Sequence, residues 1–205
     1  MKYIWALLLT LGCFGAVPAH AQQSGGNCKA GRLNLAAANA VDSSTARTTP
    51  PAVTTPTPAT AVTPTTDAEE FVQNVITNDG LHVVHFWAPW CSNSRNELTD
   101  GWHDLVADNP SVTFTFVTVW NNGQKGTSVL DQYDLPSRVK VVAQPDLGPS
   151  ANEANRRQSF LTHPVTWIPS TWIFHNNGEL AFAMNYGEMQ SSTLQSMIDA
   201  TRTNW

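Results

Sequence analysis

Cysteine, basic residues and long apolar runs are all scarce in this sequence, and each shortage excludes a class of protein. Three cysteines among 205 residues are too few for a small disulfide-built scaffold or for a structural zinc site of four thiolates. Eleven Lys and Arg against 16 Asp and Glu give a net charge of −5, which argues against a nucleic-acid binder because phosphates require a basic face. The composition also excludes a multispanning membrane protein. The length suits one ordinary domain with appendages.

The first 21 residues have the pattern of an export signal. Met1-Lys2 supplies the charged start, Ile4 to Leu11 the apolar run, and Ala19 to Ala21 a cleavage site of small residues. A membrane anchor is the competing interpretation, but the run falls well short of the roughly 20 apolar residues that span a bilayer. Lipidation at Cys13 is a third interpretation, disfavoured because Thr10 stands where bacterial lipoprotein signals usually carry Leu. We therefore expect a periplasmic or otherwise exported protein, without a stable membrane span after signal cleavage, in a compartment where disulfides persist.

Residues 22–66 differ in composition from the rest of the chain. They carry a net charge of +2, and residues 43–66 are nearly all Thr, Pro and Ala. Such a stretch cannot bury enough apolar surface to offset its chain entropy, which predicts a disordered tail and linker. From Asp67 onward seven basic residues stand against 15 acidic ones, a net charge of −8. We therefore expect a signal peptide over residues 1–21, a linker over 22–66 and one folded domain over 67–205.

From Asp67 the sequence alternates patterns typical of helices and strands, with Thr66 or Asp67 as the cap of the first helix. The expected helices cover residues 67–78, 91–107, 127–133, 152–160 and 191–201. The expected strands cover residues 81–87, 112–120 and 139–142, and a hairpin joins residues 171–174 to 180–184. Helices that alternate with strands and end in a hairpin predict an α/β fold with a mixed sheet.

The candidate chemistry concentrates around Cys91, in the segment FWAPWCSNSR over residues 86–95. A cysteine between a strand and a helix start faces unsatisfied backbone N–H groups and the positive end of the helix dipole, which favour the thiolate. This position predicts a lowered thiol pKa and a nucleophilic Cys91. Trp87 and Trp90 are predicted to form an apolar rim for a disulfide-bearing peptide. An inert, buried cysteine is the alternative.

These residues resemble the thioredoxin family. FWAPWCSNS is similar to the active-site motif FWAxWCxxC, with Ser94 in the place of the second cysteine, and residues 95–97 extend the likeness to the CxxCRxE motif of the exported TlpA-like branch. Residues 168–178, IPSTWIFHNNG, resemble the strand that the cis-proline of the family opens. The resemblance covers about residues 67–205 and implies a thioredoxin fold, a central mixed β-sheet with helices on both faces.

The resemblance also implies roles for individual residues. Cys91 would be the attacking thiol, and Ser94 would occupy the position of the resolving thiol. Pro169 would be the cis-proline beside Cys91, and Ile168 would present its backbone to an extended client peptide. A trans Pro169 would simply start an edge strand. No metal, nucleotide or flavin cofactor is implied.

Ser94 is the departure that matters most for the chemistry. Without a second cysteine there, the domain cannot close a local disulfide, so the usual dithiol cycle is not available at this position. Cys91 can still attack a disulfide and stay attached as a mixed disulfide until another thiol attacks it. Ser94 can donate a hydrogen bond to the thiolate.

His85 lies six residues before Cys91, where thioredoxins commonly carry a buried Asp. A histidine there could relay protons near neutral pH, or it could be buried, neutral and important only for packing. Both interpretations stay open at this point.

Other polar residues give weaker signals. His82 and His85 are three apart on a strand and hence on opposite faces, so this pair cannot chelate one metal. His163 and His175 are expected in surface loops. Residues 156–157, both Arg, are expected on a solvated helix face.

Cys28 is the other cysteine of the predicted mature chain, and it lies 91 − 28 = 63 residues before Cys91. A coil of that length has a root-mean-square span of roughly 40 to 48 Å, so the two sulfurs can meet. Three roles stay open for Cys28: it could resolve an adduct of Cys91, link two chains or bond to another protein.

Two functional classes follow. The first is an exported monothiol thioredoxin-like protein that exchanges thiols and disulfides with client proteins, as an isomerase or by holding clients in mixed disulfides, with a thiol reductant as a further partner. The second is a redox-inactive module that keeps the fold for protein binding, since fold alone does not imply function. Retention of Cys91 favours the first class, and loss of the second cysteine favours the second.

Overall fold

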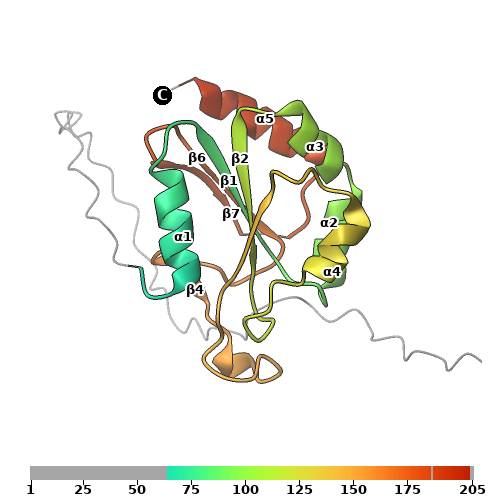
Figure 1. Ribbon diagram of the computed structural model, residues 1–205, viewed down its shortest axis with the longest axis vertical. Helices are drawn as coiled ribbons and strands as arrows, with labels where there is room; N and C mark the ends of the chain where they lie inside the picture. Colours follow the sequence, from blue (N-terminus) through green and yellow to red (C-terminus); the bar gives the residue numbers. More distant parts are fainter. Residues whose placement is uncertain (1–63, 186, 204–205) are drawn as a thin grey trace, which may run out of the picture.

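The computed structural model describes residues 64–185 and 187–203. The predicted signal peptide, most of the predicted linker, and both Cys13 and Cys28 lie outside the described residues. In the described part, a sheet lies between α1 on one side and the other helices on the opposite side (Figure 1).

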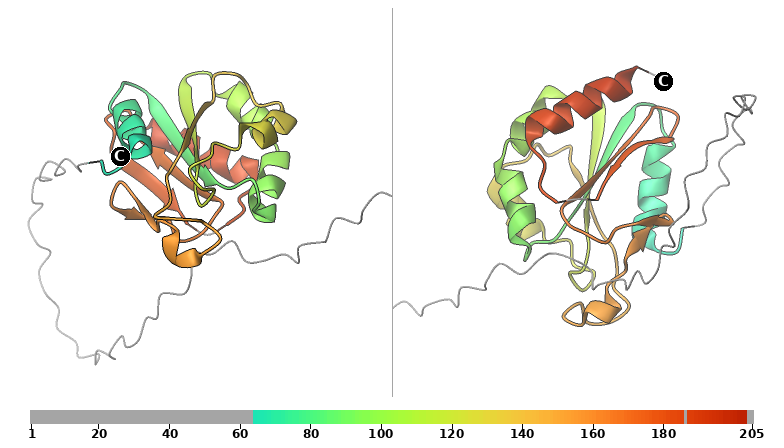
Figure 2. Two further views of the ribbon diagram at one scale, coloured as in Figure 1. Left: turned by 60° about the horizontal axis from the view of Figure 1, so that its bottom comes forward. Right: turned by 180° about the vertical axis from the view of Figure 1, so that it is seen from behind.

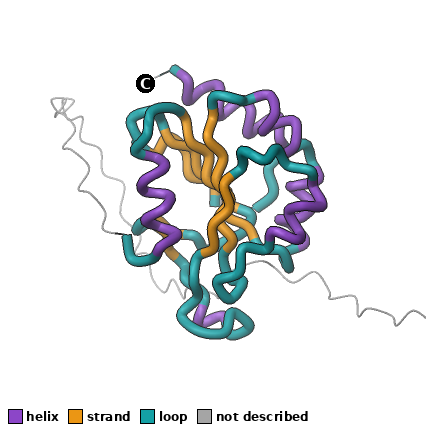
Figure 3. The backbone as a smooth tube through the Cα atoms, viewed as in Figure 1, coloured by secondary structure: helices purple, strands orange, loops and turns teal. Residues whose placement is uncertain are grey.

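A five-stranded mixed sheet lies at the centre, with the strand order β3-β2-β1-β6-β7. Its members are β1 (Leu81–Trp87), β2 (Val112–Thr118), β3 (Lys140–Ala143), β6 (Ser170–Phe174) and β7 (Leu180–Met184). β1 runs parallel to β2 and β2 to β3, whereas β1 pairs antiparallel with β6 and β6 with β7. Figure 3 shows these strands side by side in the middle of the molecule. Every residue of β1 is buried, as expected for a central strand that is covered on both faces.

Helices cover both faces of the sheet (Figures 1 and 2). One face carries α1 (Asp67–Ile76), and the other carries α2 (Ser92–Thr99), α3 (Trp102–Asp108), α4 (Thr127–Leu130) with the 3-10 turn Asp131–Tyr133, and α5 (Ser191–Arg202). Each face has its own buried apolar cluster. None of the described helices is long and apolar enough to cross a membrane. The predicted α/β fold, with a central mixed sheet and helices on both faces, is confirmed.

α1 begins where the sequence predicts. Thr66 caps it, because its side-chain oxygen accepts a hydrogen bond from the Glu69 N–H at 3.2 Å. Val72 and Ile76 are buried in the cluster on this face of the sheet. The Glu69 carboxylate also accepts a hydrogen bond from the Leu161 N–H at 2.9 Å, which ties α1 to the segment that leads into β6.

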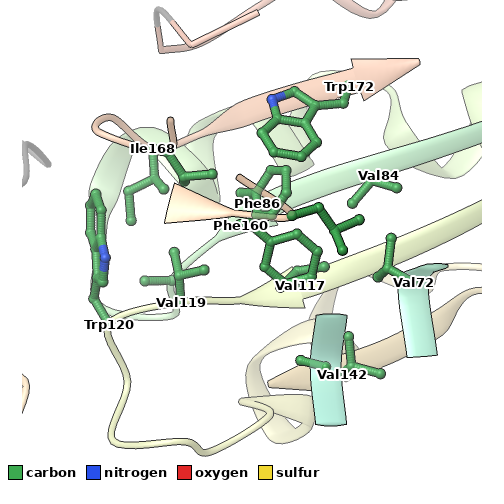
Figure 4. Packing of buried hydrophobic residues seen from close by; sticks show 14 of the residues in the cluster. Val72, Val84, Phe86, Val117, Val119, Trp120, Val142, Phe160, Ile168 and Trp172 are labelled. Atoms are coloured by element: carbon green, nitrogen blue, oxygen red, sulfur yellow. The ribbon is translucent and has the colours of Figure 1, made fainter. Parts of the chain in front are cut away.

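Aromatic rings fill the cluster on the α1 face (Figure 4). Phe86 meets Trp172 at 4.5 Å and Phe160 at 5.2 Å between ring centroids, both in edge-to-face arrangements. Such pairs are worth about 0.5–1.5 kcal/mol each beyond the burial of their area. Phe86 comes from β1 and Trp172 from β6, so these contacts hold together the two strands whose ends carry Cys91 and Pro169.

The predicted helix over residues 91–107 is wrong in one respect, because the structure divides it into α2 and α3 at Gly101. This residue has φ +89°, a left-handed conformation that favours glycine. A Cβ at this position would also lie 2.9 Å from the Ser191 hydroxyl oxygen at the start of α5. The break therefore allows α5 to pack close to the α2–α3 corner.

The predicted helix over residues 152–160 is also wrong. The structure has only a 3-10 turn at Glu153–Asn155, followed by β4 (Ser159–Phe160), which pairs with β5 (His163–Pro164) in a separate two-stranded sheet. Residues 161 and 162 both have positive φ and make the turn between these strands. Residues 144–158, here called the 144–158 loop, project beyond the sheet at the bottom of Figure 1.

Candidate functional site

Cys91 lies directly after β1 and caps the start of α2. Its N–H donates to the Ala88 carbonyl at 3.1 Å, and its own carbonyl accepts from the Arg95 N–H at 3.2 Å, the first hydrogen bond of the helix. The first N–H groups of α2 therefore surround the sulfur-bearing residue, as the sequence predicts. This backbone geometry stabilises negative charge on the sulfur whenever it is a thiolate.

The Ile168–Pro169 peptide lies beside this cysteine and is cis. The Cys91 Sγ lies 3.8 Å from the Ile168 carbonyl oxygen, although the two residues are 77 positions apart in the sequence. Both Cys91 and Ile168 have no exposed surface. The structure thus brings together the two segments that carry the family resemblance.

Cys91 is disulfide-bonded in the structure. It is the only cysteine among the residues that the structure describes, and the two other cysteines of the sequence, Cys13 and Cys28, lie outside those residues. In this state the sulfur carries no proton and is not available as a nucleophile.

Ser94 occupies the buried face of α2, one turn after Cys91. Its hydroxyl oxygen accepts a hydrogen bond from the Ala88 N–H at 3.4 Å. The serine therefore braces the turn between β1 and α2, the same turn that positions Cys91.

His85 is completely buried under this turn on β1. Its Nδ1 lies 3.0 Å from the Thr171 hydroxyl, and its ring packs 4.4 Å from Trp102 and 4.9 Å from Phe116 between centroids. Burial lowers the pKa of His85 to about 3, so the ring is neutral near pH 7. This geometry favours the packing role over a proton relay.

Glu97 is a buried residue of the site region to which the sequence assigned no role. It lies on the same face of α2 as Ser94 and Leu98 and is only 2% exposed. Burial raises the pKa of Glu97 to about 8, and the Trp102 side chain and the Met189 backbone oppose this shift only in part. Neither carboxylate oxygen has a partner at normal hydrogen-bond distance in the described residues. The helical spacing 94, 97, 98 was the signal that could have found this buried acid.

The two predicted rim residues lie in different environments. Trp90 is 40% exposed next to Cys91, whereas Trp87 has no exposed surface and packs in the cluster with Leu98 and Trp102. The predicted rim is therefore corrected to Trp90 alone, because β1 is covered on both faces up to its last residue.

Trp90 is held in place by Trp120 and by Arg156 of the 144–158 loop. Its indole N–H donates to the Trp120 carbonyl at 2.9 Å, and the Arg156 guanidinium lies 5.1 Å from the Trp90 ring and 5.7 Å from the Trp120 ring. The Arg156 Nε donates in turn to the Ser150 carbonyl at 3.0 Å. Arg156 thus clamps two tryptophans and is not on a solvated helix face, which corrects the prediction for residues 156–157.

The remaining histidines have structural surroundings. His175 is buried and its Nδ1 lies 3.3 Å from the Thr201 carbonyl, so the prediction of a surface loop is wrong for this residue. The cause is α5, whose last turn covers the end of β6. His163 is exposed, as predicted. No group of three or more His, Cys, Asp or Glu side chains in the described part of the chain could hold a metal ion.

Comparison with models of protein families and with curated proteins gives no match. Several solved structures are similar. A secreted disulfide oxidoreductase of Mycobacterium tuberculosis, homologous to E. coli DsbE, is 20% identical over 62% of this chain and 85% of its own, with a TM-score of 0.45. A thioredoxin-family thiol:disulfide interchange protein of Chlorobium tepidum is 17% identical over 62% and 83%, with a TM-score of 0.45. A thiol-disulfide isomerase of Corynebacterium glutamicum is 11% identical over 64% and 86%, also with a TM-score of 0.45.

The order of strands and helices decides the fold. A parallel β1–α2–α3–β2 unit precedes an antiparallel β6–β7 hairpin and a final helix, and β1 lies next to β6 in the sheet. The chain has a thioredoxin fold. Within it, the cysteine at the start of α2 and the cis peptide before β6 occupy the two segments whose contact forms the candidate site.

Proposed function

We propose that this chain is an exported monothiol thioredoxin-like protein that exchanges thiols and disulfides with client proteins through Cys91. The observation that carries the proposal is the placement of the Cys91 sulfur, which lies at the start of α2 and 3.8 Å from the Ile168 carbonyl beside a cis peptide. An inert core cysteine needs neither neighbour. The proposed clients bear disulfides or thiols, and the proposed reaction needs no metal or organic cofactor.

The exchange starts from the reduced protein. The Cys91 thiolate attacks one sulfur of a client disulfide, an S–S bond forms between Cys91 and the client, and the other client sulfur leaves as a thiolate. The N–H groups at the start of α2 stabilise the attacking thiolate. The exposed Trp90 ring offers the client an apolar contact beside the new bond.

The proposed role of Ser94 is to keep this mixed disulfide from resolving inside the turn. A serine hydroxyl cannot attack an S–S bond, so the adduct lasts until a thiol from elsewhere attacks it. That thiol could belong to the client itself, which gives isomerisation, or to a thiol reductant, which releases the client. A cysteine at position 94 would instead resolve the adduct locally.

The proposal also includes the regions outside the described residues. We propose that residues 1–21 direct export and are removed, that residues 22–66 form a linker, and that residues 67–205 form the functional domain. An exported location supplies the oxidised clients that the exchange requires. Cleavage rather than anchoring through Cys13 is the proposed fate of the signal.

One observation favours a second function, a thioredoxin-fold module that binds proteins without redox chemistry. Ser94 uses its hydroxyl to brace the turn, as a purely structural residue would. Under this alternative, Cys91 would have an ordinary thiol pKa and no reaction with disulfides.

The pH dependence of Cys91 alkylation separates the two functions. The reduced Cys28→Ser variant, in which Cys91 is the only thiol of the predicted mature chain, is treated with iodoacetamide at a series of pH values. We expect a midpoint below the free-thiol pKa of about 8.5. A midpoint at or above that value would support the binding module. The Cys28→Ser, Cys91→Ser double variant is the control for reaction at other side chains.

A further inference from the structure

The disulfide at Cys91 requires a second cysteine, and residue 94 does not supply it. Among the residues that the structure describes, Cys91 is the only cysteine, and it is disulfide-bonded. Of the chain's two other cysteines, Cys13 lies within the predicted signal peptide. We propose that Cys28 forms an intramolecular disulfide with Cys91 and so supplies, from the N-terminal tail, the resolving thiol that Ser94 cannot provide. The role of this bond in a reaction cycle rests on the function proposed above.

The chain enters the fold at the end of the sheet where Cys91 lies. The Thr66 hydroxyl donates to the Gln144 side chain at 2.8 Å, and the Gln144 N–H donates to the Thr118 carbonyl at 2.9 Å. Thr118 is the cross-strand partner of Trp87, the last residue of β1. Because neighbouring strands lie about 4.8 Å apart, Gln144 lies roughly 10 Å from Trp87. The tail therefore starts close to the site.

The length of the tail is sufficient for the bond. The position of Pro64 is described, so the segment that must reach back to Cys91 spans 64 − 28 = 36 residues and not the 63 that separate the two cysteines in the sequence. A coil of that length has a root-mean-square span of roughly 30 to 36 Å, well beyond the distance across a few strands. At such a linker length the effective concentration of Cys28 at the site is on the order of millimolar.

Charge complementarity favours the same arrangement. The residues around Cys28 are basic, with Lys29 next to it and Arg32 four positions on, whereas residues 67–205 carry a net charge of −8. Opposite charges on tail and domain increase the rate of encounter of the two sulfurs.

The pair gives a balanced two-electron reaction. The Cys91 thiolate attacks a client disulfide and releases the first client thiol; the Cys28 thiolate then attacks the Cys91 sulfur and releases the second. The client disulfide has gained two electrons, and the protein has lost them in forming the Cys28–Cys91 bond. A dithiol reductant that reduces this bond restores the starting state. In the oxidised state Cys91 has no free thiol, so it does not react with client disulfides.

The first test is disulfide mapping of the full mature chain. Protein exported into an oxidising compartment is alkylated, digested without reduction and analysed by mass spectrometry. We expect a linked pair of peptides that contain Cys28 and Cys91, recovered from the monomer fraction. An interchain bond, a bond to another protein or two alkylated thiols would each overturn the proposal. A Cys13→Ser variant should give the same map.

The second test measures resolution with the aromatic disulfide 5,5′-dithiobis(2-nitrobenzoate) as the client. The reduced wild type should release two equivalents of thiol and end without an adduct, whereas Cys28→Ser should release one equivalent and keep the adduct on Cys91. If both proteins keep adducts on every cysteine, the proposed exchange stands and the resolving role of Cys28 fails. If Cys28→Ser releases no thiol, the proposed exchange itself fails, whatever the disulfide map shows.

Discussion

His85 and Glu97 are both ionisable and both buried, and burial moves their pKa values in opposite directions. The pKa of His85 falls to about 3 and that of Glu97 rises to about 8, so both side chains are neutral near pH 7. The buried residues of β1 and α2 therefore provide no positive charge for a thiolate at Cys91. Within this buried region, the groups that can stabilise the thiolate are the backbone N–H groups at the start of α2.

His85→Leu should leave the pH midpoint of Cys91 alkylation unchanged, because a ring with a pKa of about 3 carries no charge between pH 5 and 10. Leucine fills most of the space between Trp102 and Phe116, which limits the structural loss. The measurement is the iodoacetamide profile in the Cys28→Ser background. A shifted midpoint would restore the proton-relay interpretation.

Glu97→Gln should change how stability depends on pH. The pKa of Glu97 is about 8 in the folded chain and has an ordinary value of 4.5, so the folded state holds a proton that the unfolded chain has released between these values. The contribution of this proton to the free energy of unfolding is fully present below pH 4.5 and is lost as the pH rises through 8. The loss is about 5 kcal/mol at most.

The measurement for Glu97 is the free energy of unfolding in urea at several pH values. We expect the wild type to lose stability from pH 5 to pH 8 and Glu97→Gln to lose much less. Glu70→Gln is the control, because Glu70 is exposed on α1. Equal slopes for the wild type and Glu97→Gln would contradict the assignment.

Three individual residues of the site differ in how well the sequence predicts their surroundings. The position of Cys91 at a helix start followed from the change of pattern between a strand and a helix, and the structure places it there. The burial of Trp87 did not follow, because alternation along a strand gives no information when both faces are covered. The sequence did not indicate that Glu97 is buried, because its burial depends on two other segments. One is α3, which lies across a turn, and the other is the segment before α5, which is distant in the sequence.

At the scale of elements, Gly101 determines how α2 and α3 meet. Helical spacing continues through residues 91–107, and the sequence signal for a bend is the pair Asp100-Gly101, which is typical of a turn. The bend is set by a tertiary contact, the close approach of Ser191 on α5. The sequence therefore predicted the helical residues correctly but not the division into two helices.

Gly101→Ala should destabilise the fold by about 1–3 kcal/mol. A side chain at φ +89° is strained, and its Cβ would lie 2.9 Å from the Ser191 hydroxyl. Gly123→Ala is the matched control, because Gly123 also has a positive φ of +69° but its nearest contact would be 3.8 Å away. Urea denaturation should give the larger loss for Gly101→Ala; equal losses would show that the contact with α5 is unimportant.

The 144–158 loop is the element that sequence patterns described least well. Its Pro, Asn and Arg residues form no regular structure beyond one 3-10 turn, and its conformation depends on the tryptophans that Arg156 contacts. These contacts join positions more than 30 residues apart, and the hydrophobic periodicity of a sequence gives no information about contacts of that kind. An irregular segment therefore helps to determine where the Trp90 ring lies beside Cys91.

Arg156→Met should lower the free energy of unfolding by about 1–2 kcal/mol, because it removes two cation–π contacts and the hydrogen bond to the Ser150 carbonyl. Arg95→Met is the control, since Arg95 is exposed on α2. Urea denaturation of both variants provides the comparison. A loss no greater than that of Arg95→Met would mean that the clamp contributes little to stability.

At the scale of the whole molecule, the position of the second thiol determines the type of redox cycle. A thiol at position 94 would resolve adducts within one helical turn, whereas a thiol on the tail must travel to the site. Resolution by the tail should therefore be slower and sensitive to the length of the linker.

Ser94→Cys should make the chain independent of its tail. In the Cys28→Ser background, the introduced thiol lies one turn from Cys91 and should form a local disulfide, so adducts disappear and reductase turnover appears with dithiothreitol as the reductant. Mass spectrometry after reaction with a disulfide substrate measures the adduct. Persistent adducts without a bond between Cys91 and residue 94 would show that the start of α2 does not have the geometry required.

The two ends of the described chain lie at opposite ends of the sheet. Thr66 is tied to Gln144 beside the site, whereas the Arg202 guanidinium donates to Ser111, which precedes the first residue of β2 at the far edge. A fluorophore or a fused reporter placed after α5 is therefore remote from Cys91 and can report on client capture without obstructing it. The same group placed just before α1 would stand at the entrance to the site, where it would compete with any incoming polypeptide.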